Sequence, residues 1–430
     1  MIILMTVGLI AFMALGMPVS YALCLIASIG YYINVGPEVF WDSTEAISSR
    51  MSYSLSNFLL LSIPFFILAA KLMNSAGITT RIFNFANTVV GFLPGGLGHA
   101  NVIASLIFAG MSGTAVSDAA GLGQIELKAM KDNGYDAEFS VGITGASSTI
   151  GPIFPPSVPM VMYSLISGAS VGYLFIGGVV PGLLMTFALM GLIVVIAKKR
   201  KYPHYPFPTA KQFFGSLFAV FLPLMTPVIL LCGIWGGFFT PSEAAVVAFS
   251  YSLFLSTVVY REMGARHLLS VFIETAKETA SIGFIICASA FYGWVLARSG
   301  VTAQLGQFMF GLTTSPIGML MIINVFLLIV GCFMEATAAI LVVGPVLMPI
   351  ATSLGIDPVH FGVVMVLNLM LGLLTPPFGV VLFIMQKVGG ISFMRVVRGT
   401  VPFLIPLFAV LLLITVFPGL VTFLPNLLMK

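Results

Sequence analysis

Ten apolar segments, most of them about 20 residues or longer, follow one another along this chain of 430 residues. Only 7% of the residues are charged and 59% are hydrophobic, whereas a soluble globular chain carries about 25% charged residues. Strands of about ten residues with alternating polarity, as in membrane barrels, are missing from the sequence. We therefore predict an all-α polytopic membrane protein with spans near 2–34, 52–75, 79–95, 138–170, 172–197, 212–235, 241–260, 277–297, 360–387 and 401–428.

Two further apolar regions, 98–131 and 318–352, are interrupted by small polar residues in "AGMSGTAVSDAAG" and "GCFMEATAA". We interpret both as re-entrant hairpins. Two of the spans are also interrupted, by "GPIFPPSVPM" and "GLLTPPFGVV", because proline cannot continue a helix. Non-helical backbone at membrane depth is tolerated only where protein buries it or a water-filled cavity lines it. The two hairpin tips and the two proline breaks are therefore predicted to meet near the midplane of the membrane.

The two halves of the chain are related by a shift of 221 residues, which places Gly151 on Gly372 and Pro155 and Pro156 on Pro376 and Pro377. The basic, proline-rich stretch "KKRKYPHYPFPTAKQ" separates the halves. The first repeat, 1–200, is predicted to hold scaffold spans in 1–95, a hairpin at 98–131, a broken helix at 138–170 and a span at 172–197. The second repeat, 201–430, is predicted to hold scaffold spans in 212–300, a hairpin at 318–352, a broken helix at 360–387 and a span at 401–428.

The distribution of basic residues then indicates the direction in which each span crosses the membrane, if the N-terminus lies outside and each hairpin returns to its own side. Fourteen fall inside: Arg50, Lys128, Lys131, Lys198, Lys199, Arg200, Lys201, Lys211, Arg261, Arg266, Lys277, Lys387, Arg395 and Arg398. Four fall outside: Lys71, Arg81, Arg298 and Lys430. This is a strong positive-inside bias. With these directions the halves run oppositely, which predicts the inverted repeat that is typical of secondary transporters.

The unwound segments offer oxygen ligands from backbone carbonyls and from the hydroxyls of Ser112, Thr114, Ser117, Thr337 and Thr375. Such a set suits a hard cation such as sodium better than zinc or copper. Half-helices that begin after the two proline pairs point their positive dipole ends at the same region, which favours an anion. The alternative is that these small residues serve close helix packing and interhelical hydrogen bonds.

Among the acidic residues, Asp118 and Glu335 are functional candidates because ionisable groups inside a membrane are costly. Asp118 alternatively caps the helix that returns from the first hairpin tip. Three other acids are predicted helix caps, namely Asp136, Glu243 and Asp357. The four histidines are dispersed and no Walker motif is present, so an intramembrane enzyme and an ATPase are disfavoured. A passive channel and a proton-coupled carrier that uses Asp118 or Glu335 remain alternatives.

The stretches "SGTAVSDAAGLGQIELKAMKDNGYDAEFS", "SSTIGPIFPPSVPMVMY", "FFTPSEAAVVA", "FMEATAAILVVGPVLMPIA" and "GIDPVHFGVVMVLNLMLGLLTPPFGVVLF" cover most of 95–390. In them the chain resembles the large membrane subunit of tripartite ATP-independent periplasmic (TRAP) transporters, which have an ion-transporter superfamily fold. The resemblance implies a sodium-dependent, elevator-type importer of an organic acid in the bacterial inner membrane. It also implies a soluble periplasmic substrate-binding protein and a small four-helix membrane subunit as partners, with no nucleic acid. Since the chain starts directly with its first span, we expect that subunit to be a separate chain.

The resemblance also implies where the ligands bind. One sodium site would use Ser112, Gly113, Thr114, Gly151 and Pro152, and the other Glu335, Ala336, Thr337, Gly372 and Thr375. The substrate would contact Ser117, Asp118, Pro155, Pro156, Ser157, Pro376 and Pro377. No organic cofactor is expected, only sodium as coupling ion. The run "TPPFGVVLF" departs from the "PPVGLNLY" pattern of dicarboxylate members, which favours a sugar acid such as sialic acid.

Overall fold

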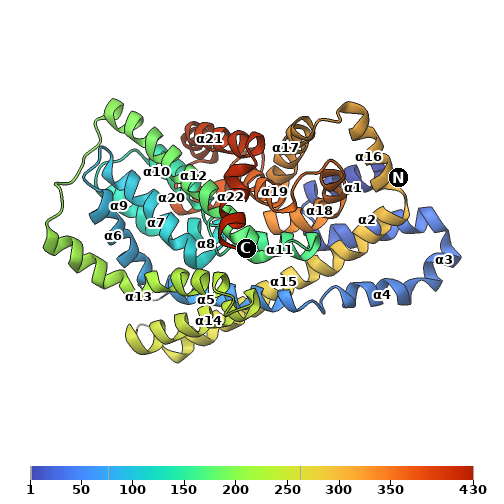
Figure 1. The fold of residues 1–430 in the computed structure, drawn as a ribbon, viewed down its shortest axis with the longest axis horizontal. Helices are drawn as coiled ribbons and strands as arrows, with labels where there is room; N and C mark the ends of the chain where they lie inside the picture. The colour runs from blue at the N-terminus through green and yellow to red at the C-terminus, as the bar shows by residue number, and fades with distance from the viewer. Residues whose placement is uncertain (1, 76, 262, 430) are drawn as a thin grey trace.

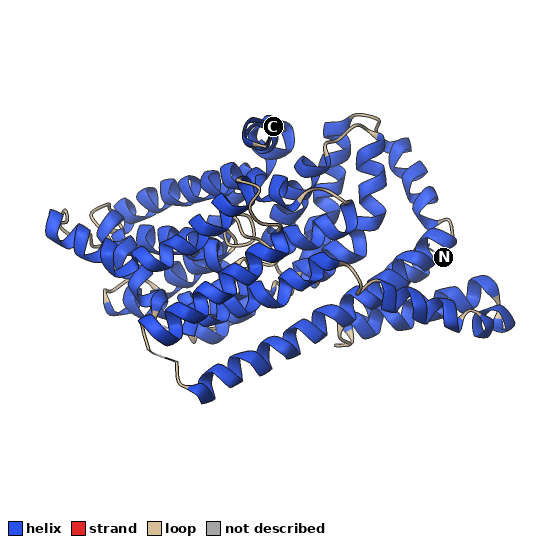
Figure 2. Cartoon of the chain, turned by 60° about the horizontal axis from the view of Figure 1, so that its bottom comes forward, coloured by secondary structure: helices blue, strands red, loops and turns tan. Residues whose placement is uncertain are grey.

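A computed structural model describes residues 2–75, 77–261 and 263–429, so Lys430 lies outside the described residues. Every regular element of these residues is helical (Figures 1 and 2). The first half contains α1 (Ile2–Ala14), α2 (Val19–Val35), α3 (Pro37–Asp42), α4 (Thr44–Tyr53), the 3₁₀ turn η1 (Phe58–Leu61), α5 (Ser62–Ser75), α6 (Ile78–Val90), α7 (Gly96–Ser112), α8 (Ala115–Ala120), α9 (Leu122–Asp132), α10 (Ala137–Ser148), α11 (Val158–Ser167) and α12 (Val171–Arg200).

The second half follows the non-helical linker 202–209. It contains α13 (Ala210–Trp235), α14 (Pro241–Phe254), the π-helical turn η2 (Leu255–Val259), α15 (Ala265–Arg298), α16 (Val301–Leu312), α17 (Pro316–Phe333), α18 (Ala336–Ser353), α19 (Pro358–Gly372), α20 (Val380–Gly389), α21 (Phe393–Val416) and α22 (Gly419–Leu428). The helices α7, α8 with α9, α10, α11 and α12 correspond in order to α17, α18, α19, α20 and α21, and the starts of the paired elements differ by 220 to 222 residues.

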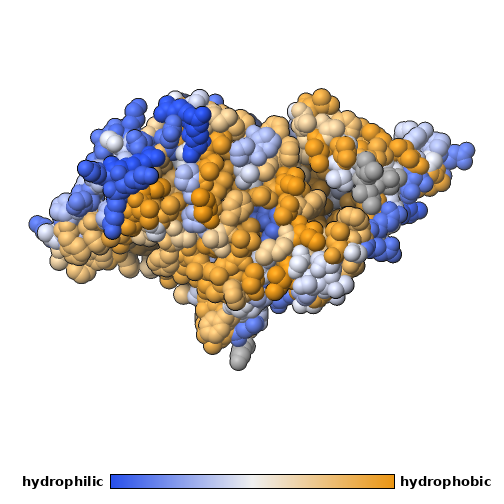
Figure 3. Space-filling model, turned by 90° about the horizontal axis from the view of Figure 1, so that it is seen from above, coloured by the Kyte–Doolittle hydropathy of each residue, from blue (hydrophilic) through white to orange (hydrophobic). Residues whose placement is uncertain are grey.

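Among the described residues, seven helices are long and apolar enough to cross a membrane, or eight if the pair α4 and α5, bent by 56°, forms one span. The seven are α12, α13, α14 with η2, α15, α17, α18 and α21. Hydrophilic residues gather near the two ends of the long axis and leave a broad apolar surface between them (Figure 3). The chain is therefore a multi-pass membrane protein. Several spans that the sequence predicted as single helices are instead built from shorter helices.

The N-terminal segment differs from the single span predicted over 2–34. Gly16 has a positive φ of 85° and Pro18 cannot donate to a preceding helical carbonyl, so the helix ends after Ala14. α2 then packs back on α1, so closely that a Cβ on Gly8 would lie 2.5 Å from Ile26 Cδ1. Among the described residues, six α-helices (α1–α6) precede the first hairpin region and four (α13–α16) precede the second, whereas the sequence predicted three spans before each. The predicted span 401–428 is also divided, between α21 and α22.

Contacts with α15 order three basic residues differently from the predicted directions. Lys71 Nζ is 2.7 Å from Glu278 Oε1, in the first half of α15, whereas the Arg50 guanidinium lies 5.3 Å from the ring centroid of Trp294, near its end. The sequence predicted Arg50 inside and Lys71 outside, with the 277–297 span running outward. These contacts instead place Lys71 nearer the predicted inner end of α15 than Arg50. Arg81 follows Lys71, because its guanidinium lies 4.6 Å from the ring centroid of Tyr260, just before α15 begins.

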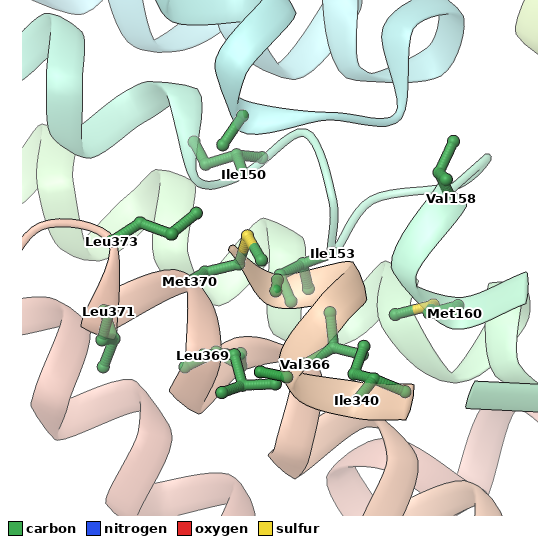
Figure 4. Packing of buried hydrophobic residues seen from close by; sticks show 14 of the residues in the cluster. Ile150, Ile153, Val158, Met160, Ile340, Val366, Leu369, Met370, Leu371 and Leu373 are labelled. Atoms are coloured by element: carbon green, nitrogen blue, oxygen red, sulfur yellow. The ribbon is translucent and has the colours of Figure 1, made fainter. Parts of the chain in front are cut away.

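The core lies where the two halves meet. α10 of the first half packs against α21 of the second, and α11 against α18. Ile150 and Ile153, from the first proline break, face Val366 and Met370 of α19 and Ile340 of α18 (Figure 4). The first break is therefore held by apolar contacts with the second half of the chain.

Candidate functional site

Each hairpin tip is hydrogen-bonded to the proline break beside it. We call α7, α8 and α9 with the turn at residues 113–114 hairpin 1, and residues 149–157 break 1. The Val158 amide donates to the Gly113 carbonyl at 3.3 Å. Gly113 has φ 61°, and a Cβ there would lie 2.8 Å from the Pro156 carbonyl oxygen. Only glycine fits this left-handed position against the backbone of the break.

Hairpin 2 comprises α17, α18 and residues 334–335, and break 2 comprises residues 373–379. The Gly379 amide donates to the Cys332 carbonyl at 3.1 Å. Gly331 and Gly372 pack backbone to backbone, since a Cβ on Gly372 would lie 2.5 Å from Gly331 Cα. The structure thus places both tips against their breaks, and the Pro155–Pro156 and Pro376–Pro377 peptide bonds are both cis.

For the first predicted sodium set, the tip residues and Gly151 lie together. A Cβ on Gly151 would lie 3.6 Å from the Thr114 carbonyl oxygen. Thr114 caps α8, because its hydroxyl accepts from the Ser117 amide at 3.3 Å. The Pro152 carbonyl accepts a hydrogen bond from the Ser157 hydroxyl. The Ser112 hydroxyl, in a residue only 2% exposed, has no hydrogen-bond partner among the described residues. An unpaired buried hydroxyl is costly without a ligand, so Ser112 fits an oxygen-ligated cation.

For the second predicted sodium set, the carboxylate of Glu335 is engaged at the start of its own helix. It caps α18 by accepting from the amides of Thr337 at 2.9 Å and Ala338 at 3.3 Å. The Thr337 hydroxyl donates to its other oxygen at 3.0 Å. The Thr375 hydroxyl donates to the Leu371 carbonyl at 2.8 Å. Glu335 therefore acts as a helix cap that also brings two carboxylate oxygens to the tip.

The predicted substrate residues divide into a buried and an exposed group. Pro155, Pro156 and Ser157 of break 1 are buried, and Ser157 caps α11 by accepting from the Met160 amide at 3.2 Å. Pro376 and Pro377 of break 2 are exposed, as is the Phe378 ring beside them, at 44%. Ser117 is half-buried and Asp118 is buried. Of the predicted substrate residues, only Pro376 and Pro377 of break 2 and, in part, Ser117 of hairpin 1 present surface to a ligand in this conformation.

Asp118 does not cap the returning helix, since Thr114 does. A buried hydrogen-bond network around Asn101 and Glu126 also lies in hairpin 1, and the sequence patterns did not single it out. Asn101 Nδ2 donates to Glu126 Oε2 at 2.8 Å and to Thr144 Oγ1 at 2.6 Å. The Ser147 hydroxyl donates to Asn101 Oδ1 at 2.7 Å. Glu126 and Asp118 are 0% and 1% exposed, and each leaves one carboxylate oxygen without a partner among the described residues. The spacing of Asp118 and Glu126, eight residues apart, was the available signal.

The three predicted caps have different outcomes. Glu243 forms the capping box with Thr240, and Asp357 accepts from the amides of Val359 and His360. Asp136 makes no side-chain cap and instead faces the inter-repeat linker. Its carboxylate accepts from the Tyr202 hydroxyl at 2.5 Å and from Arg200 at 2.6 Å, and these bonds lower the pKa of Asp136. The Asp136 contacts tie α10 to the linker.

Comparison with known proteins identifies the family. Residues 6–420 match the model of the DctM component of the tripartite ATP-independent periplasmic transporters. This chain belongs to that family. It is a transporter permease rather than an enzyme.

Two relatives match nearly the whole of this chain. The sialic acid TRAP transporter large permease protein SiaM of Vibrio cholerae is 44% identical over 98% of this chain and 97% of its own length. The C4-dicarboxylate TRAP transporter large permease protein DctM of Pseudomonas aeruginosa is 38% identical over 90% of each chain. The YdaH transporter of Alcanivorax borkumensis superposes with a TM-score of 0.67 over 97% of this chain and 98% of that one. At 12% identity, that match shows a shared fold alone.

Proposed function

We propose that this chain is the large membrane subunit of a sodium-coupled importer of an organic acid anion. The observation that carries this proposal is the pairing of each hairpin tip with its break, through Gly113 and Val158 and through Cys332 and Gly379. A pair of unwound segments at each tip supplies carbonyl and hydroxyl oxygens for a cation. The helices α11 and α20 begin immediately after the breaks, so the positive end of each helix points toward its own break.

Sialic acid, or another sugar acid, is favoured over a C4-dicarboxylate as the substrate. Support comes from the greater identity with the sialic acid permease, 44%, than with the C4-dicarboxylate permease, 38%. The departure of "TPPFGVVLF" from the dicarboxylate pattern points the same way. The exposed surface of Pro376, Pro377 and Phe378 offers an apolar wall for a sugar ring beside the positive end of α20.

For sodium, we assign one site to Ser112, Gly113, Thr114, Gly151 and Pro152, and the other to Glu335, Ala336, Thr337, Gly372 and Thr375. The unpaired, buried Ser112 hydroxyl supports the first site. The carboxylate of Glu335 supports the second, because it places negative charge beside unwound backbone. Sodium at both tips would order the segments that bind the anion, so each ligand would raise the affinity for the other.

We further propose that the two halves form an inverted repeat with re-entrant hairpins, in the bacterial inner membrane and with a periplasmic N-terminus. The hairpins and broken helices would move together as an elevator against the scaffold formed by α1–α6 and α13–α16. The words "tripartite" in the family description and "large permease" in the relatives' names support two partners. These are a small four-helix membrane subunit and a soluble periplasmic substrate-binding protein.

Uptake by proteoliposomes tests this function. The chain would be reconstituted with the small subunit and the binding protein encoded beside it, and N-acetylneuraminate and succinate would be offered separately. We expect N-acetylneuraminate uptake that requires both the binding protein and an inward sodium gradient. Uptake that proceeds without sodium or without the binding protein would indicate a passive channel and would overturn the proposal.

Two substitutions test the assigned sodium sites. Ser112→Ala and Thr337→Ala should each raise the sodium concentration needed for half-maximal uptake, by about tenfold if one ligand contact of ~1.4 kcal/mol is lost. Thr400→Ala is the matched control, because it removes a buried hydroxyl that bonds a carbonyl of its own helix. Unchanged sodium activation in both site variants, at normal abundance, would contradict the assignment.

A proton-coupled carrier of the same fold is the second candidate, and the buried carboxyls of Asp118 and Glu126 favour it. The same proteoliposomes distinguish the two. A pH gradient without sodium would then drive uptake, whereas sodium coupling predicts none under that condition.

A further inference from the structure

A cavity of about 1080 Å³ lies between hairpin 1 and α20. The returning arm of hairpin 1, α8 and α9, forms one wall, and the other wall is formed by α20 and residues 389–391. Its mouth adjoins the inter-repeat linker, because Tyr135 lines the cavity and donates its hydroxyl to the Pro203 carbonyl at 3.1 Å. The densest run of basic residues, at positions 198–201, directly precedes this linker, so the cavity opens on the face that the positive-inside bias assigns to the cytoplasm.

Side chains on the hairpin wall become more polar with distance from the tip. Val116, Ala120, Gln124, Lys128 and Lys131 line the cavity at intervals of three or four residues, so they share one helical face. Val116 lies two residues beyond Thr114, and the wall extends over about 22 Å to Lys131 at the helical rise of 1.5 Å per residue. The cavity thus extends from near the turn of hairpin 1 to the end of α9 that carries Lys131.

Positive charge converges on the outer end of this cavity from two parts of the chain. Lys128 and Lys131 come from α9, and Lys387 comes from α20 across the cavity. None of the three forms an ion pair with another residue that the structure describes, and all are exposed. Asp132 is the one carboxylate among the lining residues. A cleft with three cations and one anion holds a positive potential that concentrates anions.

Hairpin 2 lacks this arrangement. At the shift of 221 residues, Gln124, Lys128 and Lys131 correspond to Pro345, Pro349 and Thr352, none of which is charged. The equivalent helices, α18 and α11, line a smaller cleft of about 370 Å³, which includes Ile166, Leu341 and Pro345 and has no charged residue among the described residues that line it. The positive-inside rule accounts for lysines on this side of the membrane, but it does not require lysines from α9 and α20 to line one cavity.

We propose that this cavity is an anion-binding vestibule, in which Lys128, Lys131 and Lys387 hold the carboxylate of the transported acid after it leaves the tips. The proposal rests on the proposed import of an organic acid and specifies its route of release. Ammonium groups on flexible stems suit this step, since they bind a carboxylate as mobile point charges rather than in a fixed bidentate geometry. The vestibule lowers the barrier to exit by attracting the anion away from the sodium-loaded tips.

Acetylation of lysine in the purified protein tests the vestibule without reference to the substrate. The probe is inorganic sulfate, and the extent of acetylation at each lysine is measured by mass spectrometry. We expect sulfate to slow acetylation of Lys128, Lys131 and Lys387 at least about threefold more than that of Lys198, Lys199 and Lys201, because only the first group shares a cleft. Equal protection of the two groups, or none, would overturn the proposal.

Uptake by proteoliposomes provides the second test. The triple variant Lys128→Gln, Lys131→Gln, Lys387→Gln is compared with Lys198→Gln, Lys199→Gln, Lys201→Gln, which removes the same charge from the same face. We expect the first variant to lower the maximal rate severalfold while the second matches wild type, and Lys387→Gln alone to give an intermediate rate if the triple variant is poorly produced. Wild-type rates in all of them would refute the vestibule. Sulfate protection with no uptake by wild type would instead refute the proposed function and leave the anion site standing.

Discussion

The two hairpins have similar backbones but bury different side chains. Hairpin 1 buries Asp118 and Glu126, whereas the residues 221 positions later in hairpin 2 are Ala339 and Leu347, both also buried. The neighbouring helix differs in the same way, since Thr144 of α10 bonds Asn101 while the equivalent Met365 of α19 has no hydroxyl. The comparison teaches that the repeated backbone follows from repeated glycine and proline, while the buried polar groups differ between the two hairpins.

The tips differ as well. At tip 1 the chain turns through Gly113 in a left-handed conformation, and Thr114 caps the next helix. At tip 2 the equivalent turn uses Met334 in an extended conformation, and the carboxylate of Glu335 is the cap. Tip 1 is therefore closed by close backbone contact with a buried break, and tip 2 by a charged cap beside an exposed break. Three predictions test this difference.

The largest effect is expected from Gly113→Ala. Alanine in the left-handed conformation costs about 1–2 kcal/mol at any site. At Gly113 its Cβ would also lie 2.8 Å from the Pro156 carbonyl oxygen and force the tip away from break 1. We expect uptake below about one tenth of wild type, since ~1.4 kcal/mol corresponds to a factor of ten. Uptake by proteoliposomes and thermal unfolding in detergent are the measurements.

Gly134→Ala is the matched control for this prediction, because Gly134 has φ 77° and open space around its Cβ position. It should reproduce the conformational cost but retain uptake. If the two variants were equally active, close contact between tip 1 and break 1 would not matter for function.

A smaller effect is expected from the buried network. Glu126→Gln retains an acceptor for Asn101 and removes only the ionisable carboxyl group, whereas Glu126→Leu leaves an amide hydrogen of Asn101 unpaired. An unsatisfied buried donor costs about 1–3 kcal/mol, so Glu126→Leu should unfold that much more readily than Glu126→Gln. Leu347→Gln should destabilise hairpin 2 by a similar amount, because its surroundings are apolar. Equal stability of the two Glu126 variants would show that the network does not distinguish the hairpins.

The smallest effect is expected at Asp136, which connects the start of α10, in the same half as hairpin 1, to the linker. The Tyr202 hydroxyl and the Arg200 guanidinium lower the pKa of Asp136, so its contribution to stability is present above the unfolded pKa of about 3.9 and disappears as pH falls through the folded value. The side chain is 56% exposed, so screening should keep the effect below about 1 kcal/mol.

Thermal unfolding of wild type and Asp136→Asn at pH 7 and at pH 3 measures this effect. The difference between the two proteins should be present at pH 7 and smaller at pH 3. Tyr202→Phe should give part of the same loss, because it removes one of the two bonds. A difference that grows toward acid pH would contradict the assigned direction of the pKa shift.

Much of the helical architecture could be predicted from local patterns. The hairpin regions expected at 98–131 and 318–352 lie within two residues of the bounds of α7–α9 and α17–α18. The breaks were visible because consecutive prolines and glycines act on their own backbone. The single spans expected over 2–34 and 401–428 were too long, because one glycine or proline in an apolar run gives a weak signal by itself.

The sequence by itself determined that this is a helical membrane protein with two related halves, because segment length, apolar content and proline act over a few residues. Only the tertiary structure decided which polar groups meet. Glu126 meets Asn101 and Thr144, and Lys387 faces Lys128 across a cavity, through contacts between helices that lie far apart in the chain. No periodicity in one segment reports the orientation of another, so these meetings depend on how the helices pack.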